Sequence, residues 1–257
     1  MQNFRRKSTF NILVYSFYFI LSTLFLRKVI FAQGVITGYD WSVPPNIDVI
    51  ARQWTSSLYL WTHTWNFAGA SLTQGGRVLL NYFTFLFLLT SLGLGGELIS
   101  KVLVLGILTL AGIGSYTMLR SMGVGNLSAV LGGVVYMTTP VVYDLILLSG
   151  LGALCGYDML PFAFIAFLKA RRNWRGWVKY CIVCSVLLVL WPLHVLFVGI
   201  ALFTLFSICD LLVKRSKTLF LASIKCIAVT CIVSFFLQSY WTVPTILSVF
   251  GEISALP

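Results

Sequence analysis

The chain has 257 residues, of which 59% are apolar and only 10% are charged, and its mean hydropathy is +0.93. Soluble domains average about 45–50% apolar and about 25% charged residues, so this composition excludes an ordinary soluble protein and a disordered chain. A membrane-spanning helix takes about 20 apolar residues, which leaves room for about seven to nine spans and for no soluble catalytic domain. Lys and Arg outnumber Asp and Glu by 18 to 7. We attribute this excess to the positive-inside rule and expect no nucleic-acid partner.

The first apolar run, residues 8–30, follows the basic group Arg5-Arg6-Lys7, as the apolar part of a signal peptide would. No small-residue cleavage site follows it, however, and Arg27-Lys28 comes next. We therefore predict that this run is a retained first span with its N-terminus in the cytoplasm. Further apolar segments lie at 78–98, 102–119, 125–142, 157–170, 177–192, 195–212 and 219–239.

Residues 181–212 form one long apolar stretch that exceeds the length of a typical span. Trp191-Pro192 lies in its middle, where the proline lacks a backbone donor and the tryptophan favours the membrane interface. We therefore divide the stretch into two spans there. This division places the basic groups at 169–179 and 214–217 on one side, which the positive-inside rule makes the cytoplasmic side.

Residues 78–98 decide the rest of the topology, because a full crossing would put every later basic group outside. We predict that this segment enters and leaves at the outer face as a re-entrant or interfacial hairpin, with Gly93, Gly95 and Gly96 near its end. The alternatives are that 78–98 spans and the first run does not, or that the N-terminus lies outside. The predicted fold is an all-α transmembrane bundle in one membrane domain, 1–257, with about seven spans plus this re-entrant or eighth hydrophobic segment.

The predicted topology sorts the charges by side. The basic residues expected inside are Arg5, Arg6, Lys7, Arg120, Lys169, Arg171, Arg172, Arg175, Lys179, Lys214, Arg215, Lys217 and Lys225. The acidic residues expected at the outer face are Asp40, Asp48, Glu97, Asp144, Asp158 and Glu252. Only Asp210 among the acids is expected inside, so the outer face is where we look for chemistry.

The first outer loop, residues 33–77, carries an amphipathic pattern. Pro44-Pro45 ends any helix from the first span, and Asn46 is the predicted N-cap of a helix over about 47–66. Its apolar stripe is formed by Ile47, Ile50, Trp54, Leu58, Trp61 and Trp65. The three tryptophans predict that the helix lies in the outer headgroup layer, either as a plain anchor or as one wall of a site for a lipid-borne substrate.

Three acids are candidates for chemistry. Asp40 precedes the interfacial helix, where a carboxylate can bind a divalent cation or accept a proton from a hydroxyl group. Asp144 and Asp158 lie at the outer ends of adjacent spans, and a charge at the bilayer centre costs about 2.5–3.5 kcal/mol. We therefore expect both to face an aqueous cavity with a gating, substrate or metal role. Cys181 and Cys184 have a CxxC spacing, but inside an apolar span we predict that they pack as small residues.

These features are accompanied by several short motifs along the chain. The motifs are Gly38-Tyr39-Asp40-Trp41, Trp65-Asn66 with Gly75-Gly76, Tyr116-Thr117-Met118-Leu119-Arg120 with Gly123, Tyr136-Met137-Thr138-Thr139-Pro140, Asp158-Met159-Leu160-Pro161-Phe162 and Ser239-Tyr240-Trp241-Thr242-Val243-Pro244. The pattern resembles the GT-C class of membrane glycosyltransferases. Within that class it is most similar to the branch with the arabinofuranosyltransferases and the YfhO-type family.

The resemblance implies an inverting transfer of a sugar from a polyprenyl-phosphate donor to an acceptor outside the cell membrane. It implies that Asp40 is the catalytic base or a metal ligand, and that Asp144 matches the second acidic motif and would share a Mg²⁺ or Mn²⁺ ion. The residues expected to contact substrate are Trp41, Trp54, His63, Trp65, Asn66 and Asp158.

The chain departs from the family in two ways. Its members usually have ten or more spans, and their second motif is a pair of acids where this chain has Asp144 alone. We therefore expect part of a longer protein, a degenerate copy or a partner of another membrane subunit. The alternative functions are a non-catalytic assembly subunit and a lipid or solute transporter, and a transporter would carry polar residues deep in several spans.

Overall fold

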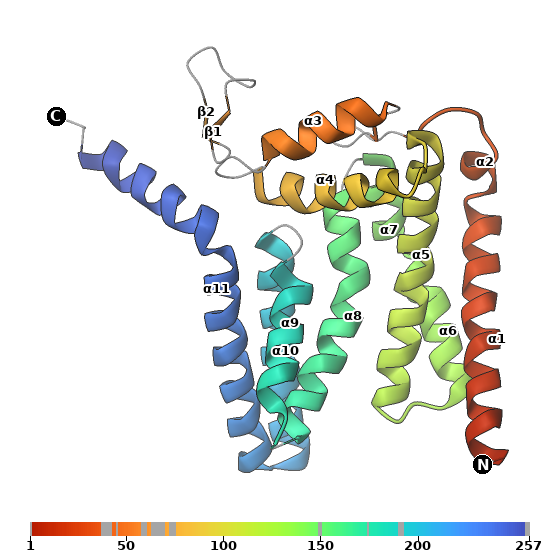
Figure 1. The fold of residues 1–257 in the computed structure, drawn as a ribbon. Coiled ribbons are helices and arrows are strands. Elements are labelled where there is room, and N and C mark those ends of the chain that lie inside the picture. The colour runs from red at the N-terminus through yellow and green to blue at the C-terminus, as the bar shows by residue number, and fades with distance from the viewer. Residues whose placement is uncertain are drawn as a thin grey trace.

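Figure 1 shows a computed structural model of the chain, which describes residues 2–36, 43–44, 46–57, 61–62, 70–71, 76–148, 151–173, 175–189 and 193–254. Its helices are α1 (Gln2–Phe25), α2 (Arg27–Ile30), α3 (Ile47–Ser57), α4 (Gly76–Ser91), α5 (Gly96–Ser121), α6 (Asn126–Met137), α7 (Pro140–Leu148), α8 (Leu151–Arg172), α9 (Trp177–Val189), α10 (Leu193–Lys214) and α11 (Lys217–Ser254). The described strands are the two-residue pair β1 (Trp61–Thr62) and β2 (Ala70–Ser71), which is antiparallel.

Five helical stretches of the described chain are long and apolar enough to cross a membrane. They are Gly96–Ser121, Asn126–Ile146, Gly152–Arg172, Val195–Lys214 and Lys217–Ser239. Two shorter apolar helices, Thr9–Phe25 and Trp177–Val189, stand among them. The expected all-helical class is confirmed, and the helix lengths are compatible with a multi-pass membrane protein.

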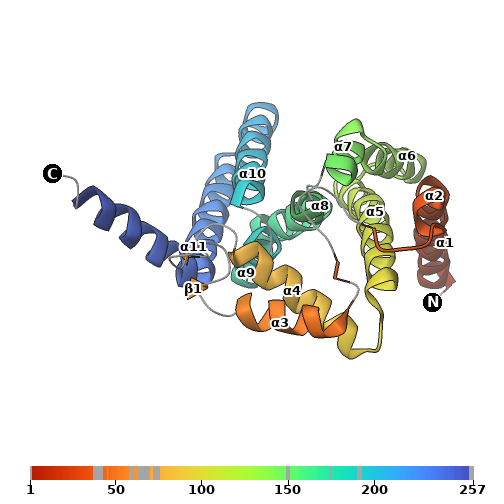
Figure 2. The ribbon, with the colours of Figure 1, turned by 90° about the horizontal axis from the view of Figure 1, so that it is seen from above.

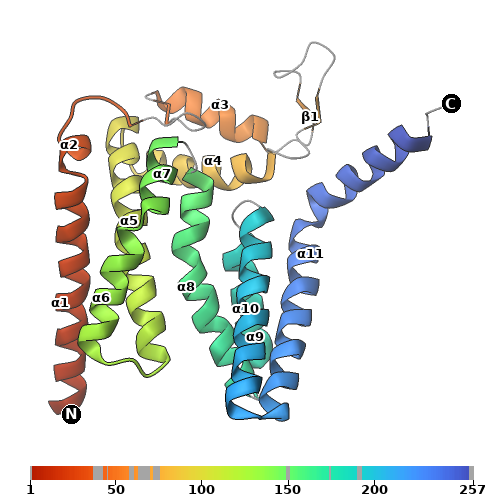
Figure 3. The same ribbon diagram turned by 180° about the vertical axis from the view of Figure 1, so that it is seen from behind.

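The long helices stand side by side and alternate in direction (Figure 1). We call the end at which α5, α8 and α10 begin the upper end, and the end at which α1, α6, α9 and α11 begin the lower end. Seen from behind, α6 and α7 lie between α1 and α8, and α10 lies between α8 and α11 (Figure 3). One apolar cluster joins α1, α5 and α6, and a second joins α8, α9, α10 and α11.

A tyrosine between two glycines holds the first cluster together. Tyr18 of α1 is fully buried, and its hydroxyl group donates a hydrogen bond of 2.9 Å to the carbonyl oxygen of Val130 on α6. A Cβ atom at Gly112 of α5 would lie 2.8 Å from the Tyr18 ring, and one at Gly133 of α6 would contact the Tyr18 hydroxyl group. Small residues let helix backbones approach closely in membranes, so these two glycines make room for the buried ring.

Helices α3 and α4 lie crosswise at the upper end instead of standing with the long helices (Figures 1 and 2). The Trp54 indole of α3 stacks on the Phe87 ring of α4 with centroids 4.4 Å apart, and its Nε1 donates to the Thr84 hydroxyl group at 3.1 Å. Ile50 of α3 and Leu86 of α4 are fully buried in the first apolar cluster. The crosswise pair is therefore part of the packed bundle.

The upper-end segments differ from the sequence prediction in two places. The predicted helix over about 47–66 is too long, because α3 ends at Ser57 and Trp61–Thr62 pairs as a strand with Ala70–Ser71. Trp61 is aromatic and Thr62 is β-branched, and both residue types favour strands over helices. The apolar segment 78–98 is divided by a turn in which Gly93 has φ +82°, a value that favours glycine, and α5 begins at Gly96.

At the other end of the chain, α11 continues past the predicted limit of 239 to Ser254. Its last part bends away from the bundle (Figure 1). Pro244 lies inside this helix, and a proline in a helix interior removes a backbone hydrogen bond and is a usual cause of a bend. The predicted break at Trp191-Pro192 agrees with the end of α9 at Val189 and the start of α10 at Leu193.

Candidate functional site

The segment after α2 is attached to the first two turns of α5 at the upper end. The N–H of Gly34 donates to Glu97 Oε1 at 3.2 Å, and the N–H of Ile36 donates to the Ser100 hydroxyl group at 3.0 Å. Lys101 Nζ donates to the Ala32 carbonyl oxygen and to Glu97 Oε1, each at 2.6 Å. Ile36 is the last described residue before 37–42, the stretch that contains Asp40. The position of Ile36 is thus fixed by the first turns of α5.

The described residues that follow 37–42 are also held at the upper end. Val43 is 1% exposed and belongs to the first apolar cluster. Asn46 Oδ1 accepts a 2.9 Å hydrogen bond from the N–H of Asp48, so Asn46 caps α3 as predicted. Asp48 lies in the first turn of α3, where the helix dipole favours an acid. Both described flanks of residues 37–42 are therefore tied to one end of the bundle.

Asp158 is the buried acid of the described chain. It lies in the upper part of α8 and is 1% exposed, and its Oδ1 atom has no hydrogen-bond partner among the described residues. A buried polar atom without a partner costs about 1–3 kcal/mol, so this open acceptor position lowers the stability of the fold. The expectation that Asp158 faces a cavity does not describe this structure, in which protein encloses the carboxyl group.

Two tyrosines pack together beside Asp158. The rings of Tyr136 on α6 and Tyr157 on α8 are stacked with centroids 4.2 Å apart and an interplanar angle of 9°. The Tyr136 hydroxyl donates to the Tyr157 carbonyl oxygen at 2.8 Å, and the Tyr157 hydroxyl donates to the Tyr136 carbonyl oxygen at 3.1 Å. The sequence analysis missed this pair, although phenol groups inside apolar spans generally find hydrogen-bond partners.

The other residues predicted for the site are placed as follows. Trp54 packs α3 against α4, and Asp144 is an exposed residue of α7. The remaining candidates lie outside the described residues, namely Asp40, Trp41, His63, Trp65 and Asn66. Within the described ranges no three His, Cys, Asp or Glu side chains gather to hold a metal ion. The Mg²⁺ or Mn²⁺ site on Asp40 and Asp144 therefore stays a prediction.

Cys181 and Cys184 are buried in the second apolar cluster on α9. Cys181 Sγ lies 3.8 Å from the Cys226 carbonyl oxygen of α11, and the neighbouring Ser185 hydroxyl donates to the Thr230 carbonyl oxygen at 3.0 Å. This environment is that of small residues packed between two helices, as the sequence predicts.

No known family model, curated protein or solved structure matches this chain. The chemistry of the upper end must therefore be judged from its own residues. They offer a loop whose flanks are held in place, a buried carboxyl group with an open acceptor position, and crosswise helices of the kind that border a membrane surface.

Proposed function

We propose that the protein is a GT-C type membrane glycosyltransferase, which moves a sugar from a polyprenyl-phosphate donor to an acceptor outside the membrane. The observation that carries the proposal is the upper end itself, where α3 and α4 lie crosswise, on the side of α5 that faces away from α1 (Figures 1 and 2). Residues on both sides of Asp40 are anchored there, through Ile36 on Ser100 and through the buried Val43. A lipid-borne donor diffuses in the membrane plane, so a site bordered by interfacial helices suits it.

In the proposed topology the spans are α1, α5, α6 with α7, α8, α9, α10 and α11, while α4 lies along the interface. Both ends of α4 lie at the upper end in Figure 1, which supports an interfacial helix over a span. The helix directions bring thirteen of the 18 basic residues to the lower end, from Arg5 in α1 to Lys225 in α11. By the positive-inside rule the lower end is cytoplasmic, and the upper end with its first loop 33–77 is outside.

The proposed reaction is a direct displacement at the anomeric carbon. Asp40 takes the proton of the acceptor hydroxyl group. The oxygen of that hydroxyl group forms the new bond to the anomeric carbon at the same time. The bond from that carbon to the phosphate oxygen breaks, and polyprenyl phosphate leaves with the electron pair. One displacement inverts the configuration. Carboxylates such as Asp40 and Asp144 are the ligand type for Mg²⁺ or Mn²⁺, which would supply neutralisation of the leaving phosphate.

Asp158 is assigned to substrate binding in this proposal. Its Oδ1 has no donor among the described residues, and a sugar hydroxyl group would supply one. Because protein encloses this carboxyl group, the surrounding side chains must move before substrate reaches it. The stacked Tyr136 and Tyr157 rings fix the stretch of α8 that carries this carboxyl group against α6. Asp158 is thus a carboxyl group held in position before substrate arrives, at the energetic cost of an open acceptor.

The test is a transfer assay on the full chain in proteoliposomes. The donors are radiolabelled polyprenyl-phosphate sugars, including the arabinofuranose, offered with an extract of outer-envelope glycans as acceptor. We expect Asp40→Asn to lower the transfer rate by about 10²–10⁴-fold, because general-base catalysis contributes that much. Asp48→Asn, an exposed acid of the same loop, is the matched control and should transfer at the wild-type rate.

Two results would count against catalysis by this chain. One is an Asp40→Asn variant that transfers as fast as the wild type. The other is a wild type that transfers from no donor, together with cells in which Asp40→Asn fully restores a glycoconjugate lost on gene deletion. The second result would identify the chain as a non-catalytic assembly subunit.

A further inference from the structure

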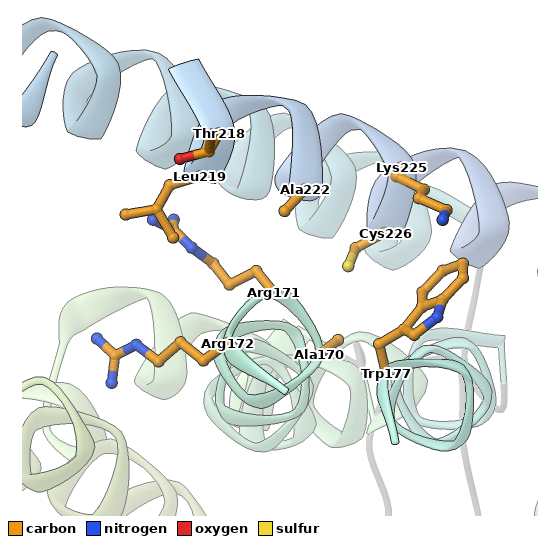
Figure 4. Close-up of a pocket in the computed structure, with 9 residues that line it drawn as sticks. All are labelled: Ala170, Arg171, Arg172, Trp177, Thr218, Leu219, Ala222, Lys225 and Cys226. Atoms are coloured by element: carbon orange, nitrogen blue, oxygen red, sulfur yellow. The ribbon is translucent and has the colours of Figure 1, made fainter. Parts of the chain in front are cut away.

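The lower end contains a basic cavity that the proposed transfer reaction does not use. The cavity has a volume of about 270 Å³ and lies between the end of α8, the start of α9 and the first turns of α11 (Figure 4). Arg171, Arg172 and Lys225 line it, together with Trp177, Thr218 and small apolar residues, and none of its lining residues is acidic. It is therefore a concave and positively charged site.

Arg171 is the central residue of this cavity. It is only 7% exposed, and in Figure 4 its side chain extends from α8 toward Thr218 and Leu219 of α11. Its Nη2 atom donates to Asp210 on α10, while its Nε and Nη1 atoms have no hydrogen-bond partner among the described residues. A guanidinium group binds oxyanions through paired N–H donors. The buried Arg171 guanidinium group has two nitrogens without an acceptor among the described residues, so it can still bind an oxyanion.

The local charge balance is also incomplete. Asp210 accepts a second ion pair from Lys214 at 2.6 Å, so one carboxylate is shared by two basic side chains. Arg172 and Lys225 add further positive charge at the cavity wall, and Lys225 Nζ lies 4.6 Å from the centroid of the Trp177 ring. A dianionic or monoanionic group in the cavity would balance this excess. The two buried Arg171 nitrogens would bind it once the guanidinium group turns toward the cavity.

We propose that this cavity binds a phosphate group, carried either by an anionic lipid headgroup or by a small soluble phosphate. Arg binds phosphate through paired N–H groups and Lys binds it as a point charge, and both residue types line the cavity. Basic pockets between transmembrane helices on the cytoplasmic side are sites for anionic headgroups. The volume is just below the roughly 300–1,000 Å³ of ordinary ligand pockets, which suits a headgroup-sized ligand.

The test compares two double variants of the full chain, purified in a neutral detergent. Arg172→Gln with Lys225→Gln removes two cavity charges and leaves the Arg171 ion pair to Asp210 intact. Arg175→Gln with Arg215→Gln is the matched control, because it removes two charges at the same end from residues that do not line the cavity. Thermal unfolding without ligand verifies that both variants are folded.

Two ligand probes separate the sources of phosphate. Native mass spectrometry measures retention of phosphatidylglycerol against phosphatidylcholine, and the unfolding midpoint is measured with inorganic phosphate against chloride at equal ionic strength. We expect the wild type and the control variant to bind one of the two probes. The cavity variant should bind that probe at least about tenfold more weakly, because hydrogen bonds to charged groups are strong. Retention of the lipid identifies a headgroup site, and a shift with inorganic phosphate identifies a soluble ligand.

The proposal is overturned if the wild type responds to neither probe, or if the cavity variant responds as strongly as the wild type. Neither outcome bears on the transfer reaction, because the cavity residues lie at the opposite end of the bundle from α3 and α4.

Discussion

Tyr136 and Tyr157 are joined twice, because each hydroxyl group donates a hydrogen bond to the backbone carbonyl oxygen of the other residue. The two bonds measure 2.8 and 3.1 Å, and the rings between them are stacked at 4.2 Å. This reciprocal contact ties α6 to α8 at the residue that precedes Asp158. The pair therefore determines where the buried carboxyl group lies.

Removing one hydroxyl group should weaken this connection measurably. We expect Tyr136→Phe to lower the free energy of unfolding by about 0.5–1.5 kcal/mol, because one hydrogen bond is lost and the stack remains. Tyr136→Leu should cost about 0.5–1.5 kcal/mol more, because the ring contact is also lost. Reversible unfolding in mixed micelles measures both values. Equal stability of the two variants would contradict a stabilising role for the stack.

The glycines that receive Tyr18 should tolerate no larger residue. A Cβ at Gly133 would contact the Tyr18 hydroxyl group and would lie 2.8 Å from the Gly112 carbonyl oxygen, so we expect Gly133→Ala to destabilise by about 1–3 kcal/mol. Gly106→Ala is the control, since nothing lies within 4 Å of its added Cβ. There alanine should be neutral or stabilise by about 0.5–1 kcal/mol. A thermal unfolding series that ranks the two in the opposite order would refute this packing.

The two basic partners of Asp210 should contribute unequally to stability. The Arg171 side chain is 3% exposed and that of Lys214 is 53% exposed. We expect Arg171→Gln to cost about 1.5–3 kcal/mol, because a hydrogen bond to a buried charge is lost. Lys214→Gln should cost less than about 1 kcal/mol, as exposed ion pairs do. Chemical unfolding of both variants and of the double variant gives the coupling, and a larger loss for Lys214→Gln would contradict the assigned burial.

We expect Asp158 to contribute to transfer activity and to lower the free energy of unfolding. Asp158→Leu removes a buried acceptor without a described partner, so we expect the free energy of unfolding to rise by about 1–3 kcal/mol while transfer activity falls. Asp158→Asn keeps a polar group of the same shape and should gain much less stability. If Asp158→Leu lowers the unfolding midpoint, the carboxyl group is a structural partner and its assignment to substrate binding is wrong.

The helical class of the fold follows from composition and from the positions of charges along the chain. The apolar runs at 102–119, 195–212 and 219–239 match helices of the described chain, because a span needs only length and hydropathy to be recognised. The end of α3 at Ser57 was not predictable in this way. The apolar stripe continues to Trp65 in the sequence, whereas the strand pairing of Trp61 depends on a partner ten residues away.

The acidic residues of the candidate site could be predicted from the sequence, but the residues that contact them could not. Asp158 stands out in the sequence because it is an acid among apolar residues, and the structure shows that it is buried. The adjacent Tyr157 contacts Tyr136, which lies on another helix 21 residues before it, and such a contact requires the packing of α6 on α8. Likewise, nothing local marks Glu97 and Lys101 as the anchors of residues 32–36. Contacts between distant segments depend on tertiary packing, which periodicity does not encode.

Sided cysteine labelling tests the central claim, that the end covered by α3 and α4 is the outer end and that α4 does not cross the membrane. Single cysteines replace Arg77 at the start of α4 and Leu92 in the turn after it, in a chain whose six native cysteines are changed to alanine or serine. Arg175→Cys, between α8 and α9, is the control for the opposite end.

With a membrane-impermeant maleimide applied to intact cells, positions 77 and 92 are predicted to react without permeabilisation. Position 175 is predicted to react only after permeabilisation. Labelling of positions 77 and 92 from opposite sides would show that α4 spans the membrane. Labelling of both only from inside would reverse the orientation and contradict the account.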